Sequence, residues 1–178
     1  MRRLTRLLLA GALAGALTLG SGCRREKIKL EPTDESIPVL GSTAHAADPN
    51  SSVQLVKGFH AVEQNSWRWT MGRFVVSLRP PPDGKERGAD LVLKFTIPAS
   101  VIDRVKSTTV SALVQNTPVG KQVYSAAGEY TLRVDVPATL LRDEVVNVEY
   151  VVDPHLAAGL VDARELGLVF LSAGFEAK

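Results

Sequence analysis

The sequence predicts an all-β protein, an antiparallel β-sandwich of about seven to eight strands preceded by a signal peptide and a flexible linker. From about residue 53 onward, apolar residues recur at every second position, which is the period of a strand with one buried face. Turn sequences containing proline or glycine separate these runs, and no long helical period lies between them. We therefore divide the chain into residues 1–22, 23–52 and 53–178.

Residues 1–22 have the order of a bacterial secretory signal. A basic start is followed by an apolar run over residues 7–19 and then by small residues. The apolar run is too short to read as a membrane-spanning helix. The small residues stand directly before Cys23, the single cysteine of the chain, and resemble the lipobox of bacterial lipoproteins. There the cysteine becomes the first residue of the mature protein and carries acyl chains such as palmitate.

We expect Cys23 to be lipidated, because a secreted protein rarely keeps one unpaired thiol. The alternative is an ordinary signal peptide with an incidental cysteine. Two or more acyl chains anchor a protein durably, so lipidation predicts a membrane-held protein of the cell envelope that faces the periplasm. Arg24 follows the cysteine, where an inner-membrane retention signal would have Asp, and this favours the outer membrane.

Residues 23–52 are expected to form a disordered linker. They combine charged residues, prolines and small residues without a sustained period. A coil of about 28 residues has a root-mean-square reach of roughly 30 Å, which keeps the folded domain near its membrane.

The strands are predicted from alternation and the loops from turn residues. The clearest strand places Tyr130, Leu132, Val134 and Val136 on one face. Further strands are expected in residues 73–78, 91–97, 107–115, 144–152 and 165–175, with turns at 80–84, 98, 116–120, 127–128, 137 and 153–154; residues 99–106 and 138–143 fit one or two helical turns. At about 125 residues, this domain is large enough to bury a core without disulfides.

The charge balance and the absence of known catalytic motifs exclude several classes of function. Without the three arginines of residues 1–22, the chain has 18 Lys and Arg against 19 Asp and Glu, so no basic nucleic-acid footprint remains and no nucleic-acid partner is expected. The sequence lacks G-x-S-x-G, H-E-x-x-H, P-loop and G-x-G-x-x-G motifs. His60 and His155 are isolated in the sequence. We therefore expect no enzyme, no cofactor and no metal site.

Two polar motifs supply the candidate site residues. Trp67 and Trp69 are two apart, so in a strand they share a face and can form an aromatic platform for a sugar ring. Alternatively, at least one of them closes the end of the core. Arg68 between them is a third candidate ligand-binding residue.

The second motif covers residues 162–167. Its Asp162 and Arg164, together with Glu63, are expected to form a structural clamp, since a guanidinium pairs bidentately with carboxylates. Arg68 is also placed to join this network. Two alternatives remain open: the same residues grip sugar hydroxyls, or Glu63 and Asp162 are the carboxylate pair of a glycan-cleaving enzyme.

The mature domain resembles a β-sandwich domain of bacterial envelope proteins that handle polysaccharide, often the periplasmic end of membrane glycosyltransferases. The resemblance rests on Gly58-Phe59, Glu63, Trp67-Arg68-Trp69-Thr70, an Asn-containing turn, Gly128-Glu129-Tyr130 and Asp162-x-Arg164-Glu165-Leu166-Gly167. It implies a jelly-roll-like sandwich with a non-catalytic, carbohydrate-related role. We therefore expect an accessory or binding module for envelope polysaccharide or for a polysaccharide-assembly protein. The alternative is a lipoprotein that binds only proteins.

Overall fold

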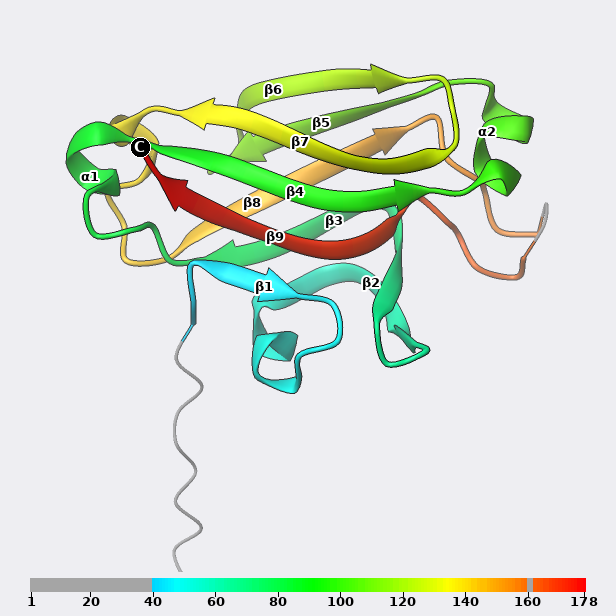
Figure 1. The fold of residues 1–178 in the computed structure, drawn as a ribbon, viewed down its shortest axis with the longest axis horizontal. Helices are drawn as coiled ribbons and strands as arrows, with labels where there is room; N and C mark the ends of the chain where they lie inside the picture. The colour runs from blue at the N-terminus through cyan, green and yellow to red at the C-terminus, as the bar shows by residue number, and fades with distance from the viewer. Residues whose placement is uncertain (1–39, 160–161) are drawn as a thin grey trace, which may run out of the picture. The chain divides into compact units, whose positions relative to one another are not determined.

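Antiparallel strands build the folded part of the chain, as the sequence predicts (Figure 1). The computed structural model describes residues 40–159 and 162–178, which belong to one folded unit. The signal peptide, Cys23 and most of the predicted linker lie outside the described residues. The strands are β1 (Thr43–His45), β2 (Leu55–Glu63), β3 (Trp67–Leu78), β4 (Ala89–Ile97), β5 (Thr108–Val114), β6 (Thr117–Tyr124), β7 (Gly128–Val136), β8 (Val146–Asp153) and β9 (Val169–Ala177).

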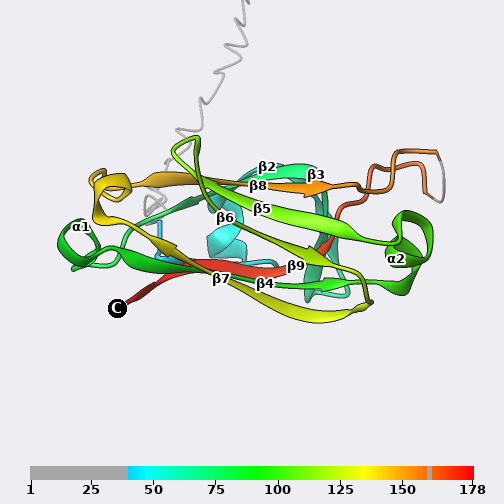
Figure 2. The ribbon, with the colours of Figure 1, turned by 90° about the horizontal axis from the view of Figure 1, so that it is seen from above.

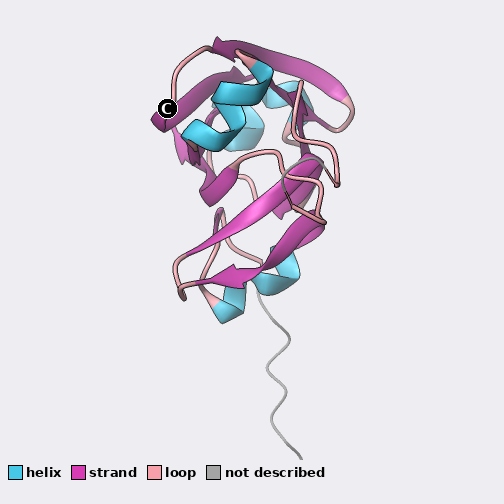
Figure 3. Cartoon of the chain, turned by 90° about the vertical axis from the view of Figure 1, so that its right-hand side faces the viewer, coloured by secondary structure: helices cyan, strands magenta, loops and turns pink. Residues whose placement is uncertain are grey.

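The helices are short. They are η1 (Pro49–Gln54), α1 (Gly84–Arg87), α2 (Ala99–Val105) and η2 (Ala138–Leu140). Figure 1 places α1 and α2 at opposite ends of the long strands, and Figure 3 shows how little of the chain is helical. The predicted helical turns at 99–106 and 138–143 are confirmed by α2 and η2.

The strands follow the order β6-β5-β8-β3-β9-β4-β7, with β1 added to β9 and β2 added to β3. The long strand β3 joins the two layers of the sandwich: its residues 73–78 pair with β8, whereas Arg68 and Trp69 pair with β9. Figure 2 shows β5 and β8 in one layer and β4, β7 and β9 in the other. Both sequence motifs therefore lie where the chain passes between the layers.

The core is built around Phe74 of β3. Its ring stacks on Tyr150 at 4.9 Å and meets Phe59 and Phe170 edge-on at 5.3 and 6.1 Å. The alternation predicted for β7 is confirmed, since its residues 132, 134 and 136 are buried and 131, 133 and 135 are exposed. Such alternation lets one face of each strand pack while the other meets solvent.

The structure differs from the predicted linker boundary at residue 52. β1 pairs with β9, and Ala44 and Ala46 are fully buried. η1 follows, with the Asp48 carboxylate accepting a hydrogen bond from the Asn50 amide at 2.9 Å. The strand has only three residues, too few to show a period, and its small side chains resemble a linker composition.

The prediction of a turn over 116–120 is also wrong in part. Only Gln115 and Asn116 form the turn, with φ of 49° and 65°, and β6 begins at the next residue. Two positive φ values suit a two-residue hairpin loop. Pro118 is tolerated inside β6 because β6 is the end strand of the sheet path and part of its backbone needs no partner.

Candidate functional site

The two polar motifs of the sequence lie against each other in the structure. The amide of Gly167 donates to the Thr70 carbonyl oxygen at 2.7 Å, and the Thr70 amide donates to the Leu168 carbonyl oxygen at 2.9 Å. The Leu168 amide donates in turn to the Thr70 hydroxyl oxygen at 3.1 Å. Thr70 is fully buried. These three bonds fix the segment before β9 onto the first half of β3.

Glu165, which lies in the same segment, adds further contacts to β3 and to neighbouring parts of the chain. Its carboxylate accepts a hydrogen bond from the Gly72 amide at 2.7 Å and lies 3.2 Å from Nε2 of His155. His60 Nε2 donates to the Glu165 carbonyl oxygen at 2.7 Å. A Cβ on Gly72 would lie 2.3 Å from the His155 ring, so glycine leaves the space that this ring occupies. Both histidines are thus engaged in contacts within the chain.

Arg164 brings Glu63 and Asp162 together. Its guanidinium binds Asp162 through two nitrogens, at 2.9 and 3.1 Å, and reaches Glu63 at 2.8 Å. The Asp162 carboxylate also accepts a hydrogen bond from the Arg164 amide at 2.9 Å. The three side chains join the end of β2 to the segment before β9, in the arrangement that a clamp would need.

Arg68 does not take part in this ion-pair network. Its Nε donates to the Ala46 carbonyl oxygen at 2.7 Å and Nη1 donates to the His60 carbonyl oxygen at 3.2 Å. Arg68 therefore ties the chain after β1 to β2 through main-chain oxygens, and its guanidinium is largely engaged within the fold.

The contacts with Arg164 lower the pKa of Asp162. Hydrogen bonds from the Arg164 side chain, and then from its amide, lower the pKa of this carboxyl from 3.8 to about 2, and the carboxylates raise the pKa of Arg164. As the pH falls, the unfolded chain takes up the proton first, so the stabilisation by this group is lost between about pH 4 and pH 2.

We expect Asp162→Asn and Arg164→Met to reduce the dependence of the free energy of unfolding on pH between about pH 4 and pH 2. Urea unfolding at pH 5, 4, 3 and 2 measures the effect as a difference from the unaltered protein. Both variants should lose less stability across this pH range. Asp162→Asn has no carboxyl at position 162, and Arg164→Met removes the guanidinium hydrogen bonds, the larger of the two causes that lower the pKa of Asp162, while the residue-164 amide still contributes. An unchanged slope in both variants would contradict the assignment.

Trp67 and Trp69 form an edge-to-face pair on β3. Their ring centroids are 6.3 Å apart and their planes meet at 83°. Both side chains are half-buried, and Trp69 packs against the hydrophobic core. The pair shares one face of the strand, and each ring keeps part of its surface accessible to a ligand.

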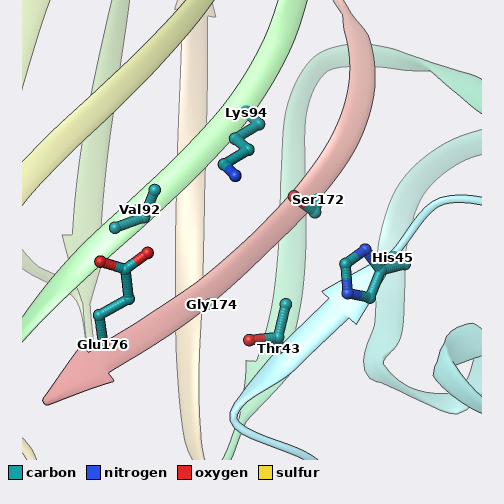
Figure 4. A pocket seen from close by; sticks show the side chains of 7 residues that line it. All are labelled: Thr43, His45, Val92, Lys94, Ser172, Gly174 and Glu176. Atoms are coloured by element: carbon teal, nitrogen blue, oxygen red, sulfur yellow. The ribbon is translucent and has the colours of Figure 1, made fainter.

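The structure also shows a groove that sequence reasoning missed, on the outer face of β1, β9 and β4 (Figure 4). Its cavity volume is about 260 Å³. Thr43 and His45 come from β1 and Lys94 from β4, while β9 contributes Ser172 and Glu176. No sequence signal identifies the groove, because β1 has the composition of a linker and the three strands are distant in the sequence.

Within residues 40–159 and 162–178, no cluster of His, Cys, Asp and Glu has the geometry of a metal site. No helix in the described part of the chain is long and apolar enough to cross a membrane. Glu63 and Asp162 hold the same guanidinium rather than facing each other across an open cleft.

Comparisons with known proteins identify no family. No family model matches the sequence, and no curated protein does so. The solved structures that match this chain include the CBM51-2 and INT domains of ZmpB from Clostridium perfringens, at a TM-score of 0.38 and 16% identity over 77% of this chain. They also include an exo-β-1,3-galactanase from Phanerochaete chrysosporium, at a TM-score of 0.40 and 7% identity over 78% of this chain. The chain spans only 28% and 29% of those two proteins. A structure described as CBM4 has a TM-score of 0.32 and 14% identity, with 75% of this chain and 80% of that one covered.

Proposed function

We propose that this protein is a non-catalytic binding module of the bacterial cell envelope, anchored through an acylated Cys23 and facing the periplasm. Its ligand is envelope carbohydrate or the machinery that assembles it. The observation that carries the proposal is the half-exposed Trp67–Trp69 pair on a rigidly held part of β3. Aromatic rings offer a large apolar surface to a sugar ring at low entropic cost.

The surroundings of the pair support a binding role. The hydrogen bonds of Thr70 and the ion pairs of Arg164 fix both sides of the hairpin that carries the two rings. A surface held in its binding geometry before the ligand arrives loses less conformational entropy on binding. The acidic residues beside it, Glu63 and Asp162, are already paired with Arg164, which supports a structural role for them rather than a catalytic one.

We expect Trp67→Ala to weaken retention on a bound polysaccharide by about tenfold or more, the range of a central aromatic contact. Trp67 is the better position for this test, because Trp69 also packs against the core. Electrophoresis through gels containing a panel of envelope polysaccharides measures retention. The protein has two tryptophans, so its emission on titration reports on this pair alone.

Trp67→Phe, which keeps an aromatic ring, should retain most of the affinity. Unchanged emission and unchanged migration across the whole panel would count against a carbohydrate-binding function.

A protein ligand is the second candidate, and one observation favours it. Val56 and Val62 of β2 are 56% and 38% exposed, and β2 pairs only with β3 in the described part of the chain. An open strand edge bearing apolar side chains is a common protein-binding surface. A stoichiometric protein partner in a pull-down, together with no polysaccharide retention, would favour this candidate.

A further inference from the structure

The groove between β1, β9 and β4 contains polar side chains that have no partner within the described residues. The hydroxyls of Thr43 and Ser172, the imidazole of His45 and the ammonium of Lys94 make no hydrogen bond or ion pair to residues 40–159 or 162–178. Figure 4 shows these side chains arranged around one hollow. Ligand sites typically combine a preformed hollow with a few converging polar groups of this kind.

The walls of the groove are fixed by the fold. β1 is held against β9 through their backbone pairing, through the hydrogen bond from the Ala46 amide to the Leu171 carbonyl oxygen at 2.9 Å, and through the burial of Ala44. A Cβ on Gly174 would lie 2.5 Å from the Thr43 hydroxyl and 2.9 Å from the Ser42 carbonyl oxygen. Glycine at this position lets β1 approach β9 closely. Thr43 and His45 of β1 therefore lie directly beside the β9 residues that line the groove.

Lys94 supplies the ammonium group of the groove. Glu176 also lines it, but its carboxylate lies 2.6 Å from the Arg133 guanidinium, which binds Asp90 at 2.9 Å as well. Lys94 is exposed and has no acidic partner in the part of the chain that the structure describes. The single Arg133 guanidinium is shared between two carboxylates, so these four side chains balance in charge. What the groove offers is the ammonium of Lys94, unpaired within the described residues, beside hydroxyl and imidazole groups.

The groove lies on the same side of the sheet as the tryptophan pair. Ser172 is opposite His45 and Val169 is opposite Trp69, whereas Phe170 and Ala173 of the same strand belong to the core. Three residues of a strand span about 10 Å. A glycan in the groove is therefore near enough for a neighbouring unit to reach Trp69.

We propose that this groove binds an acidic sugar unit, a hexuronate, within the glycan that the module recognises. The Lys94 ammonium pairs with the sugar carboxylate, and Thr43, Ser172 and His45 form hydrogen bonds with its hydroxyls. This inference rests on the proposed carbohydrate-binding function and specifies the chemical class of the ligand. Charge-assisted hydrogen bonds are the strongest polar contacts available to such a site.

The test uses the purified, isotope-labelled full chain in detergent. Methyl glucuronide and methyl galacturonide are titrated against the matched neutral methyl glucoside and methyl galactoside, with amide chemical shifts as the readout. At least one uronide should bind about tenfold more tightly than its neutral counterpart and shift the amides around Lys94 and Ser172. Added salt should reduce this preference.

Lys94→Gln should abolish the preference for the uronide, whereas Lys121→Gln on β6, an exposed lysine outside the groove, should keep it. Thermal unfolding confirms that both variants fold. The inference is overturned if neither uronide shifts these amides or if Lys94→Gln keeps the preference. If polysaccharide retention still depends on Trp67, the carbohydrate-binding function is supported even though the groove is not a uronate site. If neither uronide binding nor Trp67-dependent retention is observed, both proposals are wrong.

Discussion

Gly58→Ala is expected to lower the free energy of unfolding by about 2–5 kcal/mol, the sum of a left-handed backbone strain and a steric overlap. Gly58 has a φ of +81° and lies in β2 directly over β3. A Cβ there would be 2.2 Å from the Arg73 carbonyl oxygen and 2.7 Å from the Phe74 Cα. Both are main-chain atoms of the central strand, so the overlap cannot be relieved by rotating a side chain.

Gly159→Ala is the matched control. Gly159 has a similar φ of +88°, but no atom of residues 40–159 or 162–178 lies within 4 Å of the position that a Cβ would take. This variant should show only the backbone strain, about 1–2 kcal/mol. Urea unfolding of both variants separates strain from collision. Equal losses would show that the close approach of β2 to β3 does not limit position 58.

Thr70→Val is expected to lower the free energy of unfolding by about 1–3 kcal/mol, the cost of leaving a buried donor without an acceptor. The two side chains have nearly the same shape, so the substitution creates no cavity. It removes the hydroxyl oxygen to which the buried Leu168 amide donates at 3.1 Å. The loss reports the strength of the attachment between β3 and the segment before β9.

Thr70→Ser serves as the control, because it keeps the hydroxyl and removes only a methyl group. Hydrogen exchange at the Leu168 amide gives a second readout: exchange should accelerate in the valine variant and stay slow in the serine variant. If the valine variant were as stable as the unaltered protein, or if serine were the more damaging substitution, the hydroxyl would not be the stabilising group.

The strands were predictable from the sequence where one face of a strand is buried and the other is exposed to solvent. In β7 this requirement imposes strict alternation from Tyr130 to Val136, and the structure reproduces it. The pairing of Arg164 with Glu63 and Asp162 was open to prediction because a guanidinium binds carboxylates bidentately. Arg68 does not join this ion-pair network, because it donates instead to the main-chain oxygens of Ala46 and His60.

β1, β6 and the groove were not predictable from local patterns. β1 is too short to show a period, and Pro118 and Gly120 give β6 the composition of a loop. The groove combines side chains from β1, β4 and β9, and only the strand order brings them together. The role of Gly174, which leaves room for Thr43, can be recognised only once the pairing of β1 with β9 is known.

The position of β1 has a practical consequence for anyone producing the domain as a fragment. A recombinant version starting at residue 53 would lack the partner of Ser172, Ala173 and Gly174 in β9. It would also lose the buried methyl groups of Ala44 and Ala46. The uncovered main-chain groups of β9 would then be free to accept a strand from another molecule, and the shortened protein would be prone to self-association.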